Sequence, residues 1–448
     1  MTSSTDWPLP FPTLSKRVLG DLAAGECVAV CGLSNTGKSS LMRALAGDPA
    51  ESLFRRQVAR PITLVYVDCN RAVAISAQAF YEVVLRSVLE RLGAQAAPAL
   101  ATTLRAHHQA VTEASTSFAA SLAFNLALTE VCEQLGSGLG LLLDEFDEIY
   151  AALEARALLN LRALRDRFSD RLSFVTATLR GLEELRGHDV EDEFAEMFAR
   201  STYTMPPLSD GDADHLLEAV AGEALKAESA RLCRELAGGH PGLLVAVAQA
   251  LMEEPIGRGE EARPRIRQHP APRAECLKIW GQLKDEEQAA LTSLASDEPA
   301  GLSPQQRRRL EVLGLLRDGR IFSPLLADFA VRRQRSVGEA RQGVQLDTDS
   351  GDVWVDGSRI PVLTDLEYRL LEVLNSRRDK LTDKYQIVTA VWGEKYLGEV
   401  DDARVEKLVS RLRGKIEADP AEPRYLLTQR GRGYKLLSSP VRDAEAES

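Results

Sequence analysis

The sequence has no apolar run close to the roughly 20 residues that a membrane-spanning helix needs, so we expect no membrane anchor. Its first residues, MTSSTDWPLPFP, hold neither a basic nor an apolar segment, so we expect no secretory signal. The six cysteines form no CxxC pair and the six histidines have no metal-ligand spacing, which argues against a disulfide framework or a metalloenzyme. We therefore expect a cytoplasmic protein whose thiols are reduced and buried.

An excess of positive charge is also missing. The chain has 55 Lys and Arg against 66 Asp and Glu, a net charge of −11. A protein that coats nucleic acid without specificity would be basic throughout, and this balance argues against that class. The total leaves room for a local basic surface. The 448 residues are enough for about two to four domains of ordinary size.

Short apolar runs alternate with helical periodicity over the first 200 residues. Strand-like runs lie at 26–31, 62–69, 139–143 and 172–177, and helical stretches at 77–92, 118–135 and 151–168. This alternation predicts a parallel sheet with helices on both faces. After residue 208 the strands stop and helices follow. The expected fold class is thus multidomain, α/β followed by smaller α+β parts.

A phosphate-binding motif follows the first strand. The segment 32–39, GLSNTGKS, matches G-x-x-x-x-G-K-[ST] between a strand and a helix, the context that the motif requires. Glycines let backbone N–H groups approach phosphate oxygens, Lys38 would reach the β- and γ-phosphates, and Ser39 would ligate Mg²⁺. The expected nucleotide-binding residues are Gly32, Ser34, Asn35, Thr36, Gly37, Lys38, Ser39 and Ser40.

Two acids follow the third strand directly. An acid at the carboxyl end of a buried parallel strand lies at the edge where ligands bind. We expect Asp144 to complete the Mg²⁺ site with Ser39, and Glu145 to orient or deprotonate the attacking water. The alternative is a solvated acidic loop, which the nearby phosphate-binding motif makes less attractive. Thr176 and Thr178 end the fourth strand and are candidate sensors of the γ-phosphate, although threonine is also common in strands for its β-propensity.

The phosphate-binding motif, the LLLDEFDEI stretch and the polar fourth strand resemble the additional-strand ATPases of the AAA superclass, and more narrowly the STAND signalling ATPases and origin-recognition-like AAA proteins. The resemblance covers about residues 12–335. It implies a helical lid that contacts the nucleotide, here through Gly239, His240 and Pro241. An arginine finger would accelerate hydrolysis, and the candidates are Arg180, Arg186 and Arg200.

The end of the chain is basic. Residues 404–435 hold nine basic and four acidic residues. Helical spacing places Val405, Val409, Leu412 and Ile416 on one buried stripe of a helix over 403–417, which leaves a cationic outer face. A strand, a turn rich in Gly and Arg, and a return strand follow. A helix beside such a hairpin is typical of winged helix-turn-helix proteins that read DNA, although a cationic helix face alone is more often only a solvated surface.

Residues 343–438 resemble the OmpR/PhoB-type winged-helix domain of response regulators, through LTDLEYRLLEVL, AVWGEKY, SRLRGKIEADPAEPRYL and QRGRGYKL. The resemblance implies binding to double-stranded DNA. The implied DNA contacts are Arg404, Lys407, Leu408, Arg411 and Lys415 on the recognition helix, and Arg430 and Arg432 on the wing. Leu408 departs from the family, which usually carries a polar residue there. An ATPase also stands where the family carries a receiver domain.

Together these features predict an ATP- and Mg²⁺-binding, nucleotide-switched DNA-binding protein of STAND type. We expect a transcriptional regulator with slow ATP hydrolysis that forms a homo-oligomer on ATP binding and responds to a signal ligand or partner that the sequence does not identify. The alternative is an ATPase that uses DNA as a platform, such as a loader or a mobile-element or defence ATPase. The expected parts are an ATPase core (1–206), a helical lid (207–254), a linker (255–275), a winged-helix-like module (276–335), a linker (336–342), the winged-helix domain (343–438) and a disordered tail (439–448).

Overall fold

The computed structural model divides the chain into two compact units, Met1–Asp328 and Phe329–Ser448. Among the residues that the structure describes, no helix combines the length and apolarity that crossing a bilayer requires. The described residues are 8–57, 61–93, 97–186, 192–222, 225–253, 262–296, 302–339, 343–346, 353–360, 363–393, 402–429 and 431–439.

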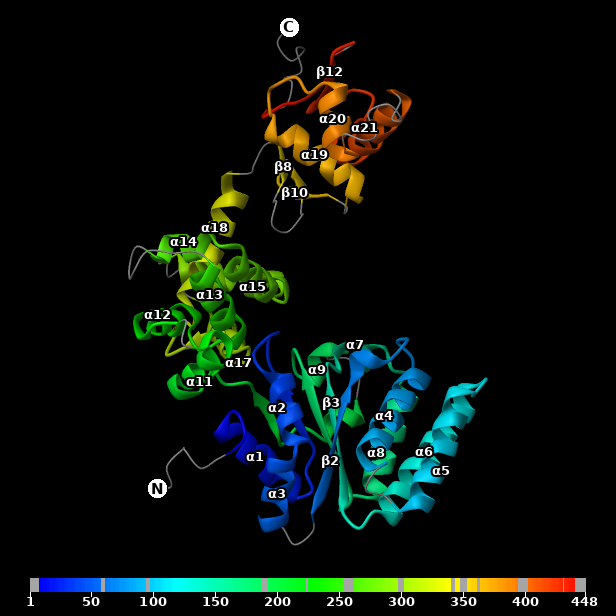
Figure 1. Ribbon diagram of the computed structural model, residues 1–448. Helices are drawn as coiled ribbons and strands as arrows, with labels where there is room; N and C mark the ends of the chain where they lie inside the picture. The colour runs from blue at the N-terminus through cyan, green and yellow to red at the C-terminus, as the bar shows by residue number, and fades with distance from the viewer. Residues whose placement is uncertain are drawn as a thin grey trace. The chain divides into compact units, whose positions relative to one another are not determined.

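A five-stranded parallel sheet forms the centre of the first unit (Figure 1), with the order β2-β3-β4-β1-β5. The strands are β1 Val28–Cys31, β2 Ile62–Asp68, β3 Gly138–Asp144, β4 Leu172–Thr178 and β5 Thr202–Thr204. Every residue of β1, β3 and β4 is buried, which the apolar runs of β1 and β3 predict and the polar residues of β4 do not. Since β4 separates the motif-bearing β1 from β3, the sheet has the additional strand that the AAA resemblance implies.

Helices cover both faces of this sheet, as expected from the alternating pattern (Figure 1). One apolar core joins the sheet to α4, α6 and α8, and a second joins the opposite face to α1 and α2. The helices of this region are α1 Pro12–Ala23, α2 Lys38–Leu45, α3 Asp48–Gln57, α4 Ala77–Leu92, α5 Pro98–Thr112, α6 Ser117–Gln134, α7 Asp147–Ala152, α8 Ala155–Arg167, α9 Leu182–Leu185 and α10 Glu193–Glu196. All six cysteines are buried and none is in a disulfide.

Among the described residues, the rest of the first unit consists of helices and their connections, apart from one small hairpin. Its elements are α11 Asp210–Ala221, α12 Ala227–Ala237, α13 Pro241–Glu253, α14 Ala262–Gln268, α15 Pro270–Gly281, α16 Asp285–Ala295, α17 Pro304–Val312, β6 Leu316–Arg317 and β7 Arg320–Ile321. The hairpin turns at Asp318 and Gly319, which both have positive φ and form the Asp-Gly pair that such turns favour.

The interpretation of 255–275 as a linker is wrong for the residues that the structure describes there. Residues 262–275 lie in α14 and α15, and Ala262, Ile266 and Pro272 are buried. Prolines are acceptable in the first turn of a helix, and Pro270 is the first residue of α15. The linker proposed at 336–342 also changes, because α18 (Pro324–Glu339) runs into it.

The second unit packs α19 Asp365–Ser376, α20 Lys384–Val391 and α21 Asp402–Ile416 around one apolar core. Thr364 and Glu367 form a capping box at the start of α19. The strands are β8 Val344–Leu346, β9 Val353–Val355 and β10 Ser358–Arg359 in one sheet, and β11 Leu426–Gln429 and β12 Gly433–Leu436 in a hairpin. A helical core with a β-hairpin after its last helix is the expected winged-helix arrangement. Of the proposed tail, residues 440–448 lie outside the described residues.

Candidate functional site

The GLSNTGKS segment forms a tight loop between β1 and α2. A Cβ atom on Gly32 would lie 2.9 Å from Thr36 Oγ1 and 3.0 Å from Met205 Cβ. Gly37 has φ of +98°, and its Cβ would lie 2.8 Å from Phe11. Side chains therefore fit at neither position, and the two glycines let the loop close on itself.

Lys38 lies inside this loop. Its ammonium donates hydrogen bonds to Gly32 O at 2.6 Å and Leu33 O at 3.1 Å. Burial lowers the pKa of Lys38, while the nearby carboxylates of Glu145 and Asp147 raise it. Ser39 is half-buried beside it and Ser40 is exposed. The loop thus gathers a buried cation, a hydroxyl and closely spaced backbone N–H groups, a combination that fits a phosphate chain.

The acids are at the same edge of the sheet. Asp144 ends β3 opposite Asp68, which ends β2. Asp144 Oδ2 accepts a hydrogen bond from Tyr66 Oη at 2.8 Å, and burial together with this carboxylate raises the pKa of Tyr66. Asp144 Oδ1 is buried and has no partner among the described residues. A buried carboxylate oxygen without a partner among the described residues, at the carboxyl end of β3, is the kind of oxygen ligand that Mg²⁺ prefers.

Glu145 follows Asp144 in the left-handed region, with φ of +52°, and is exposed at the mouth of the site. Desolvation raises the pKa of its carboxyl, against the lowering effect of Lys38. Asp147, a residue that sequence reasoning did not select, accepts a hydrogen bond from Leu179 N at 2.7 Å and joins the ends of β3 and β4. The positions of Asp144 and Glu145 are those that a metal ligand and a base would need.

The two threonines of β4 differ in their surroundings. Thr176 Oγ1 is buried and has no partner among the described residues, so it is available to a ligand or a water. Thr178 Oγ1 instead donates to Arg180 O at 2.7 Å, which fixes the turn after β4. Thr176 is therefore the better candidate for contact with a phosphate or the attacking water.

The interpretation of Arg180 as a candidate arginine finger, made from the sequence, is wrong. Its guanidinium is 7% exposed and makes a two-pronged ion pair with Glu287 of α16, with distances of 2.8 and 2.6 Å. It also donates to Gln282 O at 2.9 Å. A cation held in this way joins the sheet edge to the winged-helix-like module and is not free to reach a phosphate.

The other two arginine candidates also differ from each other. Arg186 donates to Tyr150 O at 3.0 Å and Leu153 O at 2.5 Å, so it has a structural role. Arg200 has a side chain that is 87% exposed and lies 3.9 Å from Glu26. Arg200 can act only where a neighbouring molecule approaches this surface.

The tip of the phosphate-binding loop is bound by residues far along the chain. Gln282 Oε1 accepts from the Ser34 backbone N–H at 2.9 Å, and Gln282 Nε2 donates to Ser34 Oγ. Asn35 Nδ2 donates to both carboxyl oxygens of Glu275, at 3.0 and 2.9 Å, and Asn35 O accepts from Gly242 N at 3.1 Å. We name Gln282 and Glu275 the loop clamp. No sequence signal identifies it, since a single Gln and a single Glu in a helical region match no motif.

The Gly-Gly-His-Pro element packs beside this loop. His240 is 5% exposed, its Nδ1 accepts from Leu243 N at 3.2 Å, and its Nε2 has no partner among the described residues. Burial is the main cause that lowers the pKa of His240 to about 4, and Lys38 adds to it. The imidazole is therefore neutral near pH 7 and can offer one N–H to a ligand at the loop.

The candidate DNA-contact residues of α21 fall into two groups. Arg404, Lys407 and Arg411 are exposed on the outer side of the helix. Leu408 is 1% exposed within the apolar core, so its interpretation as a DNA contact is wrong. Positions 405, 408, 409 and 412 follow i, i+3, i+4, i+7, and all four are buried.

Two further basic residues hold the unit together. Lys415 Nζ is 2.7 Å from the buried carboxylate of Glu367, so its charge is balanced inside the unit. Arg413, which was not proposed as a contact, donates to Leu426 O and fixes α21 to the hairpin. On the hairpin Arg432 is exposed, whereas Arg430 lies outside the described residues.

Comparison with known proteins assigns a family to this second unit. Residues 359–436 match the family described as "Transcriptional regulatory protein, C terminal". The uncharacterized transcriptional regulatory protein YrkP of Bacillus subtilis is 36% identical over 96 residues, 21% of this chain and 41% of that protein. The transcriptional regulatory protein KdpE of Mycobacterium tuberculosis is 37% identical over 113 residues, 24% of this chain and 49% of that protein. The chain thus spans less than half the length of these two relatives, and its C-terminal part carries a DNA-binding domain of the transcription-regulator type.

The solved structures similar to the first unit are more distant. The Walker-type ATPase PABY2304 of Pyrococcus abyssi is 14% identical, with a TM-score of 0.46, over 71% of this chain and 94% of that one. The Aeropyrum pernix ORC2 protein, in ADPNP and ADP complexes, is 15% identical, with a TM-score of 0.42, over 79% and 92%. The AAA-like fold of the first unit is established by its own strand order and loop geometry.

Proposed function

We propose that this protein is an ATP-controlled, DNA-binding regulator of transcription of STAND type, with slow ATP hydrolysis. One observation carries the proposal: the tip of the phosphate-binding loop is hydrogen bonded to the loop clamp, Gln282 and Glu275, in the helical part that follows the sheet. Because the same loop would hold a nucleotide, occupancy of the loop and the position of these helices are coupled.

At the nucleotide end, Lys38 would contact the β- and γ-phosphates, and the loop N–H groups would hold the phosphate oxygens. Ser39 and Asp144 would hold Mg²⁺, which neutralises phosphate charge when it is bound. Glu145 is placed to orient water, and its raised pKa suits a group that takes up a proton. Thr176 and His240 have the unpartnered polar atoms that could recognise the terminal phosphate.

The switch follows from competition at the loop. A phosphate would compete with Gln282 for the Ser34 N–H, and the carboxylate of Glu275 would repel it. Release of Gln282 affects Arg180 as well, because Arg180 binds the Gln282 backbone and Glu287 of α16. The ion pair gives the nucleotide site a direct route to the winged-helix-like module.

At the DNA end, Arg404, Lys407 and Arg411 lie on the exposed side of α21 and Arg432 on the hairpin, the positions of a recognition helix and a wing. Two such units held together gain effective concentration on adjacent half-sites. We therefore propose that ATP promotes a homo-oligomer that binds double-stranded DNA tightly, in the cytoplasm where the DNA is found.

The test is selection of bound DNA by the full chain, followed by affinity measurement on the selected site without nucleotide, with ADP and with ATP. A regulator should enrich a discrete sequence and bind it more tightly with ATP, and Lys38→Ala should remove the difference. Equal affinity and equal oligomeric state in all three conditions would refute the proposal. Strong DNA-stimulated hydrolysis without sequence preference, lost in Glu145→Gln, would instead identify an ATPase that uses DNA as a platform.

A further inference from the structure

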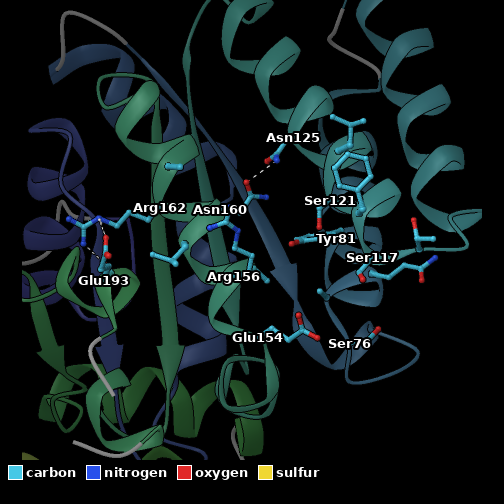
Figure 2. Close-up of a pocket in the computed structure, with 18 of the residues that line it drawn as sticks. Ser76, Tyr81, Ser117, Ser121, Asn125, Glu154, Arg156, Asn160, Arg162 and Glu193 are labelled. Carbon is cyan, nitrogen blue, oxygen red and sulfur yellow. Dashed lines mark hydrogen bonds and ion pairs between the residues drawn. The ribbon is translucent and has the colours of Figure 1, made fainter. Parts of the chain in front are cut away.

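A polar cavity lies away from the nucleotide site, on the sheet face covered by α4, α6 and α8. Its volume is about 890 Å³, within the range of sites for small molecules. Figure 2 shows labelled side chains from all three helices around one space, with Tyr81 from α4, Ser121 and Asn125 from α6, and Arg156 and Asn160 from α8. The cavity lies within the first unit.

The wall of this cavity contains polar atoms without partners. Tyr81 is 1% exposed, and its hydroxyl has no hydrogen-bond partner among the described residues. Asn125 Nδ2 donates to Asn160 Oδ1 at 2.8 Å, which leaves Asn125 Oδ1 and Asn160 Nδ2 buried without partners among those residues. Exchanging both amide orientations would still leave one acceptor and one donor, so this result does not depend on how the amides are assigned. Buried polar groups are normally satisfied, so these three groups, one from each helix around the cavity, need partners from a ligand or from water in the cavity.

The other lining residues indicate what kind of ligand fits. Hydroxyls of Ser76, Ser117 and Ser121 add uncharged groups, while Phe118 and Leu122 of α6 are 76% and 47% exposed and offer an apolar surface. At the rim, Arg162 is paired with Glu196 at 2.8 Å and with Glu193 at 3.7 Å, and Glu154 and Arg156 also line the cavity, so charges of both signs lie there. A hydroxyl group can donate to and accept from such a wall, and the C–H face of a sugar ring can pack on an aromatic side chain.

We infer that this cavity between α4, α6 and α8 is a binding site for a small neutral polyhydroxylated ligand, such as a monosaccharide or cyclic polyol, held by Tyr81, Asn125 and Asn160. The site is placed to influence the nucleotide. The helix α6 leads into β3, which ends at Asp144, and α8 leads into β4, which carries Thr176. A ligand between these helices would act on both strands, as an inducing signal must.

The experiment measures binding by calorimetry and thermal shift on the full chain, without nucleotide or DNA, so its outcome is independent of the proposed function. The probes are D-glucose, D-galactose, N-acetyl-D-glucosamine and myo-inositol, with L-glutamate and L-arginine as charged comparisons. We expect at least one neutral probe to bind with a Kd of about 1 mM or tighter and to raise the Tm.

Two variants test the location. Tyr81→Phe removes only an unpartnered hydroxyl, so the Tm of the free protein should not fall, while probe binding should weaken about five- to tenfold. The double variant Asn125→Leu with Asn160→Leu replaces both members of a hydrogen-bonded pair. Because no buried partner is left unsatisfied, the variant should still fold, and it should lose probe binding. Gln109→Leu on the exposed surface of α5 is the control and should bind like the unmodified chain.

Three results would overturn the inference. The first is no binding of any neutral probe at tens of millimolar. The second is preferred binding of a charged amino acid, which would exclude the neutral class. The third is binding that Tyr81→Phe and the double asparagine variant leave unchanged, which would place the ligand elsewhere.

Discussion

Removal of the Gln282 amide should increase the affinity of the chain for ATP. Gln282 makes two hydrogen bonds to Ser34, from the Ser34 N–H to Oε1 at 2.9 Å and from Nε2 to the Ser34 hydroxyl. Each such bond contributes a net ~0.5–1.5 kcal/mol, so the pair stabilises the clamped loop by about 1–3 kcal/mol. A nucleotide that must displace Gln282 loses that stabilisation. Gln282→Leu should therefore lower the Kd for ATP by about 5- to 150-fold, and partial solvent exposure of Gln282 favours the lower part of that range.

The assay is calorimetric titration of ATP into the full chain, with and without the substitution. The matched control is Gln288→Leu, because Gln288 also makes two side-chain hydrogen bonds, to Trp280 O and Leu283 O, both at 3.1 Å. These bonds stay within the module and do not touch the loop, so ATP affinity should not change.

A second measurement separates release of the loop from a general loosening of the module. In Gln282→Leu, DNA binding without nucleotide should approach the binding of the unmodified chain with ATP. If Gln282→Leu binds ATP no more tightly, or if Gln288→Leu has the same effect, then the clamp does not compete with the nucleotide and the proposed switch is wrong.

Five other substitutions have expected outcomes. Burial raises the pKa of Glu287, but hydrogen bonds from two arginines have the larger, opposite effect and lower the pKa to about 2. A carboxyl with a lowered pKa stabilises the fold above its ordinary pKa of about 4.5, and this stabilisation is lost as the pH falls to 2. Urea unfolding should therefore show a loss on the order of 3 kcal/mol of unfolding free energy between pH 4.5 and 2, and Glu287→Gln should not show it. Glu145→Gln should keep ATP binding and lower hydrolysis about 10²- to 10⁴-fold, measured by phosphate release. Arg411→Ala should cost about 1–3 kcal/mol of binding free energy on the selected DNA and relax the preference for one base. Arg432→Ala should lower the affinity for all DNA sequences alike and reduce the slope of log affinity against log salt concentration by about 1. Titrations at several salt concentrations measure both effects. Leu408→Ala should cost about 2–5 kcal/mol of unfolding free energy because Leu408 is a core residue, and denaturant melts of the full chain would detect it.

The local pattern of the sequence predicts most of the first unit. The helical period over 77–92 gives the limits of α4, because an apolar stripe and a serine cap are both local signals. The strand β5 has no such signal. It is three residues long, Thr202 is exposed, and it exists because the edge of β1 offers unpaired backbone groups. The prediction of a linker over 255–275 is wrong because proline, which disfavours the interior of a helix, is also common in the first turn of a helix.

In the candidate site, some residues can be predicted from the local sequence, whereas others depend on contacts with distant parts of the chain. Lys38, Asp144 and Glu145 are predicted because the loop that leads to Lys38 follows β1, the two acids stand at the end of β3, and parallel strands bring their ends to one edge. Gln282 and Arg180 are not predictable in this way. Gln282 lies 248 residues from Ser34, and the partner of Arg180 lies 107 residues away. An arginine after a strand looks the same in sequence whether it is free or buried in an ion pair.

The corrected recognition surface is short, which supports the proposed pairing of two copies. With Leu408 in the core and Lys415 bound to Glu367, the exposed cations of α21 are Arg404, Lys407 and Arg411 among the proposed contacts. They span eight residues of helix, with about 10 Å between the first and the last, which corresponds to about three base pairs. So short a site recurs too often in a genome to select a gene, whereas two units on adjacent half-sites double the sequence that is read. A footprint obtained with ATP should therefore contain two half-sites, and DNA with one half-site scrambled should bind no better than random DNA. Full affinity for a single half-site would show that pairing has no part in recognition.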